Sequence, residues 1–129
     1  MGHAIQLADA HLKDFTLMEG EFDKISSIGM FEHVGIANHP TYFGAVNRLL
    51  RPRGLYLHHC ISRRAKKTDK AFNRMPAEYR ALVRYIFPGG HIPSMSEFTP
   101  AIERAGLVIC DIEVLRLHYA ETLKVWREN

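Results

Sequence analysis

The sequence lacks long hydrophobic runs. No window approaches the roughly 18 consecutive apolar residues of a membrane-spanning helix. The opening residues, MGHAIQLADAHLKDF, also lack the basic start and apolar stretch of a secretory signal peptide. We therefore expect a cytoplasmic protein. Its two cysteines, Cys60 and Cys110, lie in apolar runs, which indicates buried free thiols and not a disulfide.

Several catalytic motifs are missing as well. HExxH and CxxC do not occur, and the eight histidines form no closely spaced ligand set, so we expect no metal site. There is no GxSxG turn to expose a nucleophilic serine and no GxxxxGK[ST] loop to hold phosphates. Hydrolase and nucleotide-triphosphatase functions lose their main support. The net charge of +3 is too small to indicate a nucleic-acid partner.

The length and composition are those of one folded domain. At 129 residues with 47% hydrophobic and 24% charged residues, the chain is expected to form a single domain over residues 1–129. The run 22–31 is short and almost continuously apolar, as in a strand covered on both faces. An amphipathic helix is predicted to start at Asn38 and Pro40 and to stop at Pro52. Residues 54–62 then form a second strand.

The second half of the chain predicts two helices, a strand and a final helix. One helix starts at Pro76, and another has capping-box spacing between Ser94 and Glu97 and ends at Gly106. Residues 107–115 are rich in β-branched side chains and predict a third main strand. The final helix carries Tyr119 with Leu123 and Trp126 on one side.

Alternating strands and helices predict an open α/β sheet, in which ligands bind beyond the carboxyl ends of parallel strands. This rule selects Glu32 and His59, which follow the first and second strands. A carboxylate there can accept a proton or orient an anion, but it equally fits an ion pair or a helix cap. His59 suits proton transfer near neutral pH, although histidines at strand ends are more often structural. His58 is expected to point to the opposite face of the sheet.

Four segments in order along the chain resemble the cyclopropane-fatty-acyl-phospholipid synthase family, which includes the mycolic acid cyclopropane synthases. They are FDKISSIGMFEHVG, TYFGAVNRLLRPRGLYLHHCI, YIFPGGHIPS and AGLVICDIEVLRLHYAETLKVW. The resemblance implies an S-adenosylmethionine-dependent enzyme with a Rossmann-like class I methyltransferase sheet and flanking helices. Its implied reaction transfers a methylene group to the double bond of an unsaturated lipid acyl chain. The implied partner is therefore an unsaturated phospholipid at a membrane surface, on the inner face of the membrane.

The family's chemistry requires a base that removes a proton from the transferred methyl group. In this family a bound bicarbonate has that role, held by a carboxylate, a histidine, a tyrosine and nearby backbone. The resemblance assigns these positions to Glu32, His59, Tyr119 and Ile61. From the residues alone, Tyr119 is also explained as a core residue that packs with Leu123 and Trp126.

The sequence departs from the family at both ends. The glycine-rich loop and the first strands of the sheet have no counterpart, nor does the last strand, so we expect a carboxyl-side part of the domain that is inactive alone. Asp9 matches the acidic residue near the adenine of the cofactor, but Ala10 replaces the tyrosine that follows it. Cys60 does not correspond to the family's cysteine near the bicarbonate.

Two surface properties and two other functions stay open. A partial sheet leaves an unpaired edge, which favours a homo-oligomer. The basic residues between Arg63 and Lys67 could contact anionic lipid headgroups or simply be solvated. The chain could also derive from a related small-molecule methyltransferase, or act as a noncatalytic, truncated oligomeric module.

Overall fold

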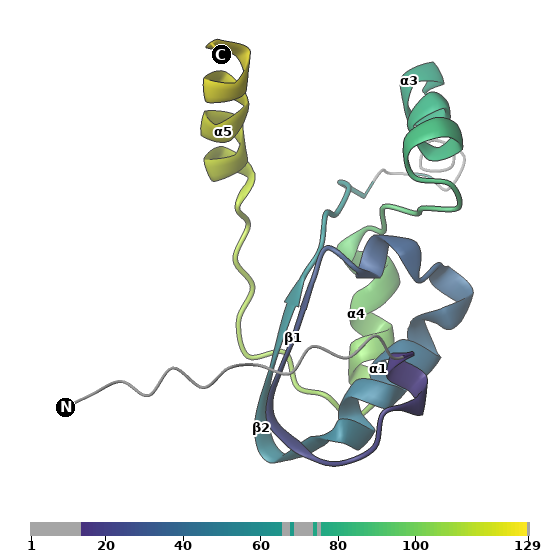
Figure 1. The fold of residues 1–129 in the computed structure, drawn as a ribbon, viewed down its shortest axis with the longest axis vertical. Coiled ribbons are helices and arrows are strands. Elements are labelled where there is room, and N and C mark those ends of the chain that lie inside the picture. Colours follow the sequence, from purple (N-terminus) through teal and green to yellow (C-terminus); the bar gives the residue numbers. More distant parts are fainter. Residues whose placement is uncertain (1–13, 66–67, 69–73, 75, 129) are drawn as a thin grey trace, which may run out of the picture.

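The computed structural model describes residues 14–65, 68, 74 and 76–128. Within them, the elements follow the predicted alternation of strands and helices (Figure 1). In chain order they are the short 3-10 helix η1 (Phe15–Leu17), β1 (Phe22–Ile28), the 3-10 turns η2 (Phe31–His33) and η3 (Ile36–Asn38), α1 (His39–Leu49), β2 (Leu50–His59), α3 (Ala77–Ala81), the π-helical turn η4 (Leu82–Ile86), α4 (Met95–Arg104) and α5 (Arg116–Glu128).

The strands β1 and β2 run parallel and are joined by α1, which confirms the predicted strand–helix–strand unit (Figure 1). Regular pairing extends from Lys24 opposite Leu55 to Ile28 opposite His59. Before Leu55 the register shifts, and Arg53 has a positive φ of 67°. The second strand therefore begins at Leu50, earlier than predicted, through this irregular segment.

The helices α1 and α4 have the start signals that the sequence predicts. In α1 a proline stands within the first turn, where its missing N–H costs no hydrogen bond. In α4 the capping box is formed: the Glu97 carboxylate accepts hydrogen bonds from the Ser94 N–H at 2.6 Å and from the Ser94 hydroxyl at 2.9 Å. Both helices present their apolar sides to the same space and lie on one side of the sheet (Figure 1).

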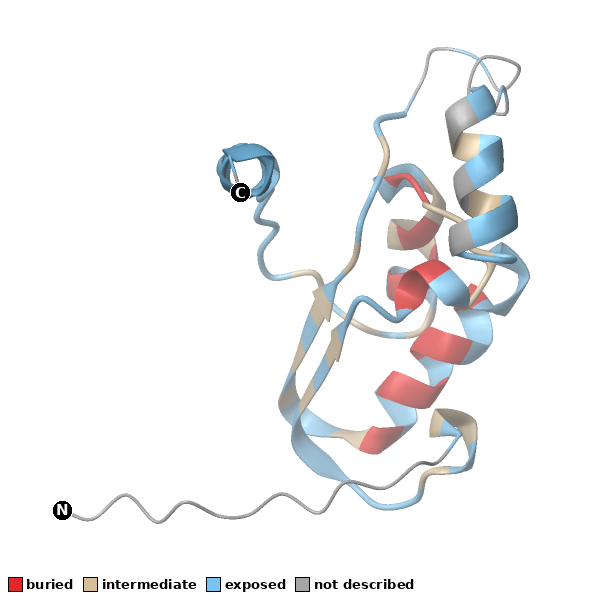
Figure 2. Cartoon of the chain, turned by 45° about the horizontal axis from the view of Figure 1, so that its top comes forward, coloured by how far each residue is buried: buried red, intermediate tan, exposed pale blue. Residues whose placement is uncertain are grey.

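The core lies between that side of the sheet and the two helices (Figure 2). Its buried members come from η2, α1 and α4: Phe31, Tyr42, Phe43, Val46, Phe98, Ala101 and Ile102. The prediction that β1 is covered on both faces is wrong for the described residues, because Ile28 on the outer face is 66% exposed. Leu55 and Leu57 on the same face of β2 are also exposed.

The predicted third strand at residues 107–115 is not formed. This segment is extended and unpaired, and leads from α4 to α5 (Figure 1). Leu107 and Ile109 pack partly against the core, whereas Val108 is 84% exposed, so the strand-like alternation is present. A strand also needs a neighbour that offers free backbone groups, and no described segment lies beside this one to do so.

The predicted final helix is confirmed as α5, which stands apart from the rest of the described structure (Figure 1). Its residues Tyr119 and Trp126 contact one another edge to face, with ring centroids 6.4 Å apart. Neither is buried in the structure. Among the helices of the described residues, none is long and apolar enough to span a membrane.

We predict that replacing the fully buried Phe43 by alanine lowers the free energy of unfolding by about 3–5 kcal/mol, because the change leaves a cavity among aromatic rings. Leu57→Ala is the matched control, since Leu57 is 59% exposed, and it should change this free energy by less than about 0.5 kcal/mol. Chemical denaturation followed by circular dichroism measures both. Similar losses in the two variants would show that the core is not where the structure places it.

Candidate functional site

Glu32 occupies the turn η2, immediately beyond the carboxyl end of β1, and is 9% exposed. Its Oε1 accepts a hydrogen bond of 2.6 Å from the backbone N–H of Ile61, just beyond the end of β2. Its own carbonyl oxygen accepts a 2.8 Å hydrogen bond from the N–H of His91. The carboxylate is therefore held where ligands bind in an open α/β sheet.

The second carboxylate oxygen, Oε2, is buried and has no hydrogen-bond partner among the described residues. A buried polar atom without a partner costs about 1–3 kcal/mol. Such an exception in an otherwise satisfied structure indicates an acceptor that a ligand, a proton or a water can use. Glu32 thus has one oxygen fixed by the backbone and one oxygen available for chemistry.

The other residues selected from the sequence lie in different surroundings. His59 ends β2 and is exposed, while Ile61 is 58% exposed and reaches Glu32 through its backbone. Tyr119 is 55% exposed in α5, which the structure does not bring to Glu32 (Figure 1). Asp9 lies outside the described residues. The structure thus joins Glu32 and Ile61 directly and leaves the Tyr119 side chain apart.

His58 is the residue of this region that sequence reasoning did not select. As expected from strand alternation, it points away from the face of His59 and into the core. Its ring contacts five aromatic rings, those of Phe31, Tyr42, Phe43, Tyr56 and Phe98. The alternating pattern of GLYLHHCIS contained this signal, because it places Tyr56, His58 and Cys60 on one face.

Burial controls the ionisation of this face. Desolvation lowers the pKa of His58 from 6.5 to about 4, and the charge of Glu32 opposes that shift only in part. Burial also lowers the pKa of His39, which stacks on Phe31. The pKa of the half-buried Cys60 thiol is raised to about 11, so the thiol is protonated and is not a nucleophile at neutral pH. Cys110, expected to be buried, is an exposed free thiol.

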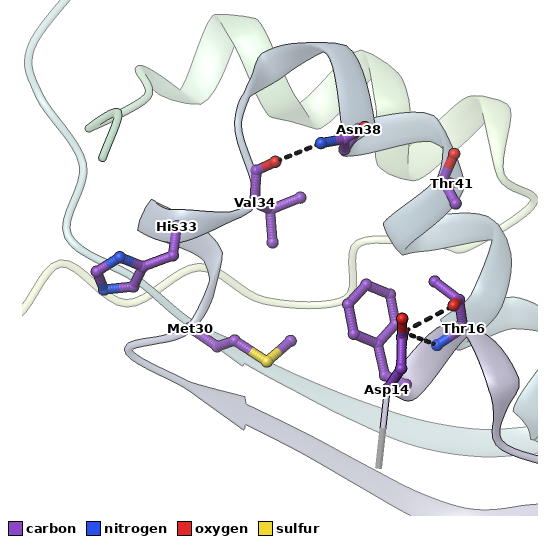
Figure 3. Close-up of a pocket in the computed structure, with 8 residues that line it drawn as sticks. Asp14, Thr16, Met30, His33, Val34, Asn38 and Thr41 are labelled. Atoms are coloured by element: carbon purple, nitrogen blue, oxygen red, sulfur yellow. Dashed lines mark hydrogen bonds between the residues drawn. The ribbon is translucent and has the colours of Figure 1, made fainter. Parts of the chain in front are cut away.

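A pocket of about 330 Å³ lies beside Glu32, between η1 and the segment that follows β1 (Figure 3). Its apolar lining includes Phe15, Met30 and Val34. At its rim the Asp14 carboxylate accepts hydrogen bonds from the Thr16 N–H and hydroxyl, at 2.9 and 2.7 Å. The volume is at the lower end of the range for small-molecule sites. Within the described residues, no group of three or more side chains could hold a metal ion.

The comparisons with known proteins agree with this arrangement. Residues 3–129 match the model of the family described as mycolic acid cyclopropane synthetase. A probable fatty acid methyltransferase of Pseudomonas putida is 44% identical over 112 residues, which cover 86% of this chain and 27% of that protein. The cyclopropane-fatty-acyl-phospholipid synthase of Escherichia coli K12 is 39% identical over 118 residues, which cover 92% of this chain and 28% of that protein.

A solved structure shares the fold. The crystal structure of mycolic acid cyclopropane synthase CmaA1, complexed with SAH and CTAB, superimposes with a TM-score of 0.73 at 30% identity and covers 87% of this chain and 41% of that one. The fold is thus part of an α/β sheet of the kind found in cyclopropane synthases. The chain belongs to the mycolic acid cyclopropane synthetase family. It spans little more than a quarter of the curated relatives named above.

The lowered pKa of His58 predicts how stability depends on pH. Because the unfolded chain binds this proton near pH 6.5 and the folded chain near pH 4, acid favours unfolding. The free energy of unfolding should be constant above pH 6.5 and decline as pH falls from 6.5 to 4, with His39 contributing in the same direction. Urea denaturation across this range measures the decline.

Two variants separate the cause. His58→Leu should reduce the loss of stability between pH 6.5 and 4, whereas replacement of the exposed neighbour in His59→Leu should leave it unchanged. An unchanged pH dependence in His58→Leu would show that His58 is not the group responsible.

Proposed function

We propose that this chain supplies the base-holding side of an S-adenosylmethionine-dependent methyltransferase that forms cyclopropane rings on unsaturated lipid acyl chains. The observation that carries the proposal is the buried carboxylate of Glu32, with Oε1 on the Ile61 N–H and Oε2 without a partner among the described residues. Family membership and the matching fold support the reaction class. The intact protein would act as the enzyme, and residues 1–129 alone would be inactive.

S-adenosylmethionine, when bound, supplies an electrophilic methyl group on a sulfonium centre, which the double bond of the lipid attacks. Positive charge then develops on the lipid chain, and one proton of the transferred methyl group must leave as the ring closes. A fixed anion at this point stabilises the charge without reorganisation of solvent. Glu32 provides the fixed carboxylate, and its burial excludes water that would capture the cation.

Bicarbonate fits the residues present. Its oxygen atoms can accept hydrogen bonds and its hydroxyl can donate one, which would satisfy the unpartnered Oε2 of Glu32. In this proposal His59 donates to the anion and the Ile61 backbone lies against it. The hydroxyl of Tyr119 is a further donor, a role that requires α5 to pack near the end of β1. Glu32 then orients the base that takes the proton.

The pocket beside Glu32 is the proposed site for part of the cofactor. It lies at the carboxyl end of β1, and its lining of Phe15, Met30 and Val34 suits an apolar or aromatic portion of a ligand (Figure 3). Asp9 is proposed to lie near the adenine. The chain has no glycine-rich loop to receive the methionine part.

A fatty acid methyltransferase that forms a methyl or methylene branch is the second candidate, because the relative with 44% identity has that kind of name. Both reactions begin with methyl transfer to a double bond. They separate when the cation forms: direct loss of a methyl proton closes the ring, whereas a hydride shift before proton loss gives a methylene branch. The position of the base held by Glu32 decides between them.

The remaining proposals concern location and partners. The lipid substrate would place the intact protein in the cytoplasm and at the membrane surface. Each strand of the two-stranded sheet has one edge unpaired within the described residues, which supports the proposal of a homo-oligomer.

A chimera tests the proposed function. Residues 3–129 of this chain would replace the matching segment of the Escherichia coli relative, and the chimera would be given S-adenosylmethionine and unsaturated phospholipid. We expect fatty acids heavier by the mass of one CH₂ group, with the upfield proton signals of a cyclopropane ring. Mass spectrometry and proton NMR of the extracted lipid measure the two properties. A heavier product with vinylidene signals would support the methylene-branch candidate instead.

Variants of the chimera identify the residues that act. Glu32→Gln keeps the shape of the side chain but removes its charge, and should lower turnover by about 10²-fold or more, as expected for loss of a general base or its support. Glu97→Gln is the matched control: this carboxylate lies in the capping box of α4, and the change should cost stability but little turnover. Equal turnover in Glu32→Gln and the unaltered chimera would contradict the role of Glu32.

We also predict that the chain alone binds S-adenosylmethionine weakly or not at all, because the glycine-rich loop that approaches the cofactor in the family has no counterpart in this sequence. Isothermal titration calorimetry with the purified chain measures this directly. Saturable binding with a micromolar dissociation constant would show that the residues present form most of the cofactor site. The chimera is the positive control.

A further inference from the structure

A chain of hydrogen bonds leads from β1 to His58. The Tyr42 hydroxyl donates to the Ser27 hydroxyl at 2.5 Å, and the Tyr56 hydroxyl lies 2.8 Å from that of Tyr42. The Tyr56 oxygen is in turn 3.0 Å from Nδ1 of His58. All four side chains are on the face of the sheet that α1 and α4 cover, which shields the chain from solvent.

This chain fixes the proton on His58. A tyrosine hydroxyl carries a single proton, and that of Tyr42 is used on Ser27, so Tyr56 must donate to Tyr42. The Tyr56 oxygen can then only accept, and Nδ1 of His58 must be the donor. A neutral imidazole with its proton on Nδ1 has a lone pair on Nε2. Nε2 of His58 is therefore an acceptor.

That acceptor is buried and has no partner within the described residues, as is also the case for Oε2 of Glu32. The two groups lie close enough for the charge of Glu32 to act on His58. Phe31, next to Glu32 in the chain, packs edge to face on the His58 ring with centroids 4.7 Å apart. One region of the core thus contains two acceptors and, among the described residues, no donor for either.

We propose that His58 is a positioning residue for Glu32, and that one buried water donates its two hydrogens to Nε2 of His58 and Oε2 of Glu32. A single water has the two donors that these acceptors lack, and buried waters commonly satisfy such groups. His58 then acts through the water, fixing the carboxylate against the Ile61 N–H. The inference rests on the proposed function only for the role of Glu32, and a bicarbonate ion would displace or join this water.

The neutral state of His58 is part of the mechanism of positioning. A protonated imidazole would form an ion pair with Glu32 and occupy the oxygen that the proposed reaction uses. Besides Glu32, the titratable groups that act on His58 are His39 from α1 and His59 on β2, and both disfavour its protonation. Tyr56 adds no charge, because burial first and its bond to Tyr42 second raise its pKa.

The experiment is NMR on the full chain without lipid or cofactor, so its result is independent of whether methyl transfer occurs. Long-range proton–nitrogen spectra at neutral pH should show the His58 proton on Nδ1. Dipolar transfer from water should reach the His58 ring and the Ile61 amide, as expected for a long-lived bound water. A proton on Nε2, or no transfer from water to these groups, would overturn the proposal.

Variants test whether His58 positions Glu32 or merely fills the core. His58→Asn retains a donor toward Tyr56 but lacks an acceptor at the Nε2 position, and should accelerate hydrogen exchange of the Ile61 amide about tenfold. His58→Gln places a polar group at the Nε2 position and should restore slow exchange. A change at the exposed neighbour, His59→Asn, is the matched control and should have no effect.

The amides of the β1–β2 ladder report on the fold in each variant. A purely structural role predicts faster exchange throughout the ladder and the same result for Asn and Gln at position 58. That outcome, or an equal effect of His59→Asn, would contradict positioning. Failure of the chimera to modify lipid would count against the proposed function while leaving these spectra unaffected.

Discussion

The hydrogen bond between the Glu32 carboxylate and the Ile61 amide connects the ends of the two strands, and the arrangement of the site depends on it. Parallel strands that end side by side leave their final backbone groups without ladder partners. In this protein one such N–H is satisfied by a charged acceptor from the neighbouring strand's loop, at 2.6 Å. Charge-assisted bonds of this kind are about twice as strong as neutral ones. The same contact therefore closes the end of the sheet and orients the candidate catalytic group.

The aromatic core below this bond explains how a carboxylate can be kept buried. Phe31 precedes Glu32 and contacts five rings, including those of His39 and His58. With its ring fixed on several sides, the backbone of η2 has little freedom to turn Glu32 toward solvent. Burying a carboxylate without a nearby cation is costly. The packing around Phe31 contributes to offsetting this cost, which links core stability to the geometry of the site.

Much of this fold could be predicted from the sequence where the signal was local. The capping box at Ser94 and the apolar spacing of α1 depend on neighbouring residues, and both helices were predicted correctly. The strand at 107–115 was not formed, because pairing depends on a neighbour that no local pattern specifies. Glu32 was found from its place after a strand, whereas the network through Tyr42 and Tyr56 joins residues from separate elements and could not be read from spacing. The roles of His59, Tyr119 and Asp9 rest on resemblance and stay predictions.

The two bonds that fix Glu32 have donors of one kind. The carboxylate is held by the amide of Ile61, and the carbonyl of the same residue is held by the amide of His91. Both donors belong to the main chain, so any residue except proline at these two positions can supply them. Evolution is then free to vary the side chains at 61 and 91, and with them the shape of the surface around the site, without losing the orientation of the acid. A backbone clamp of this kind lets a family diversify its substrates while keeping one chemical step.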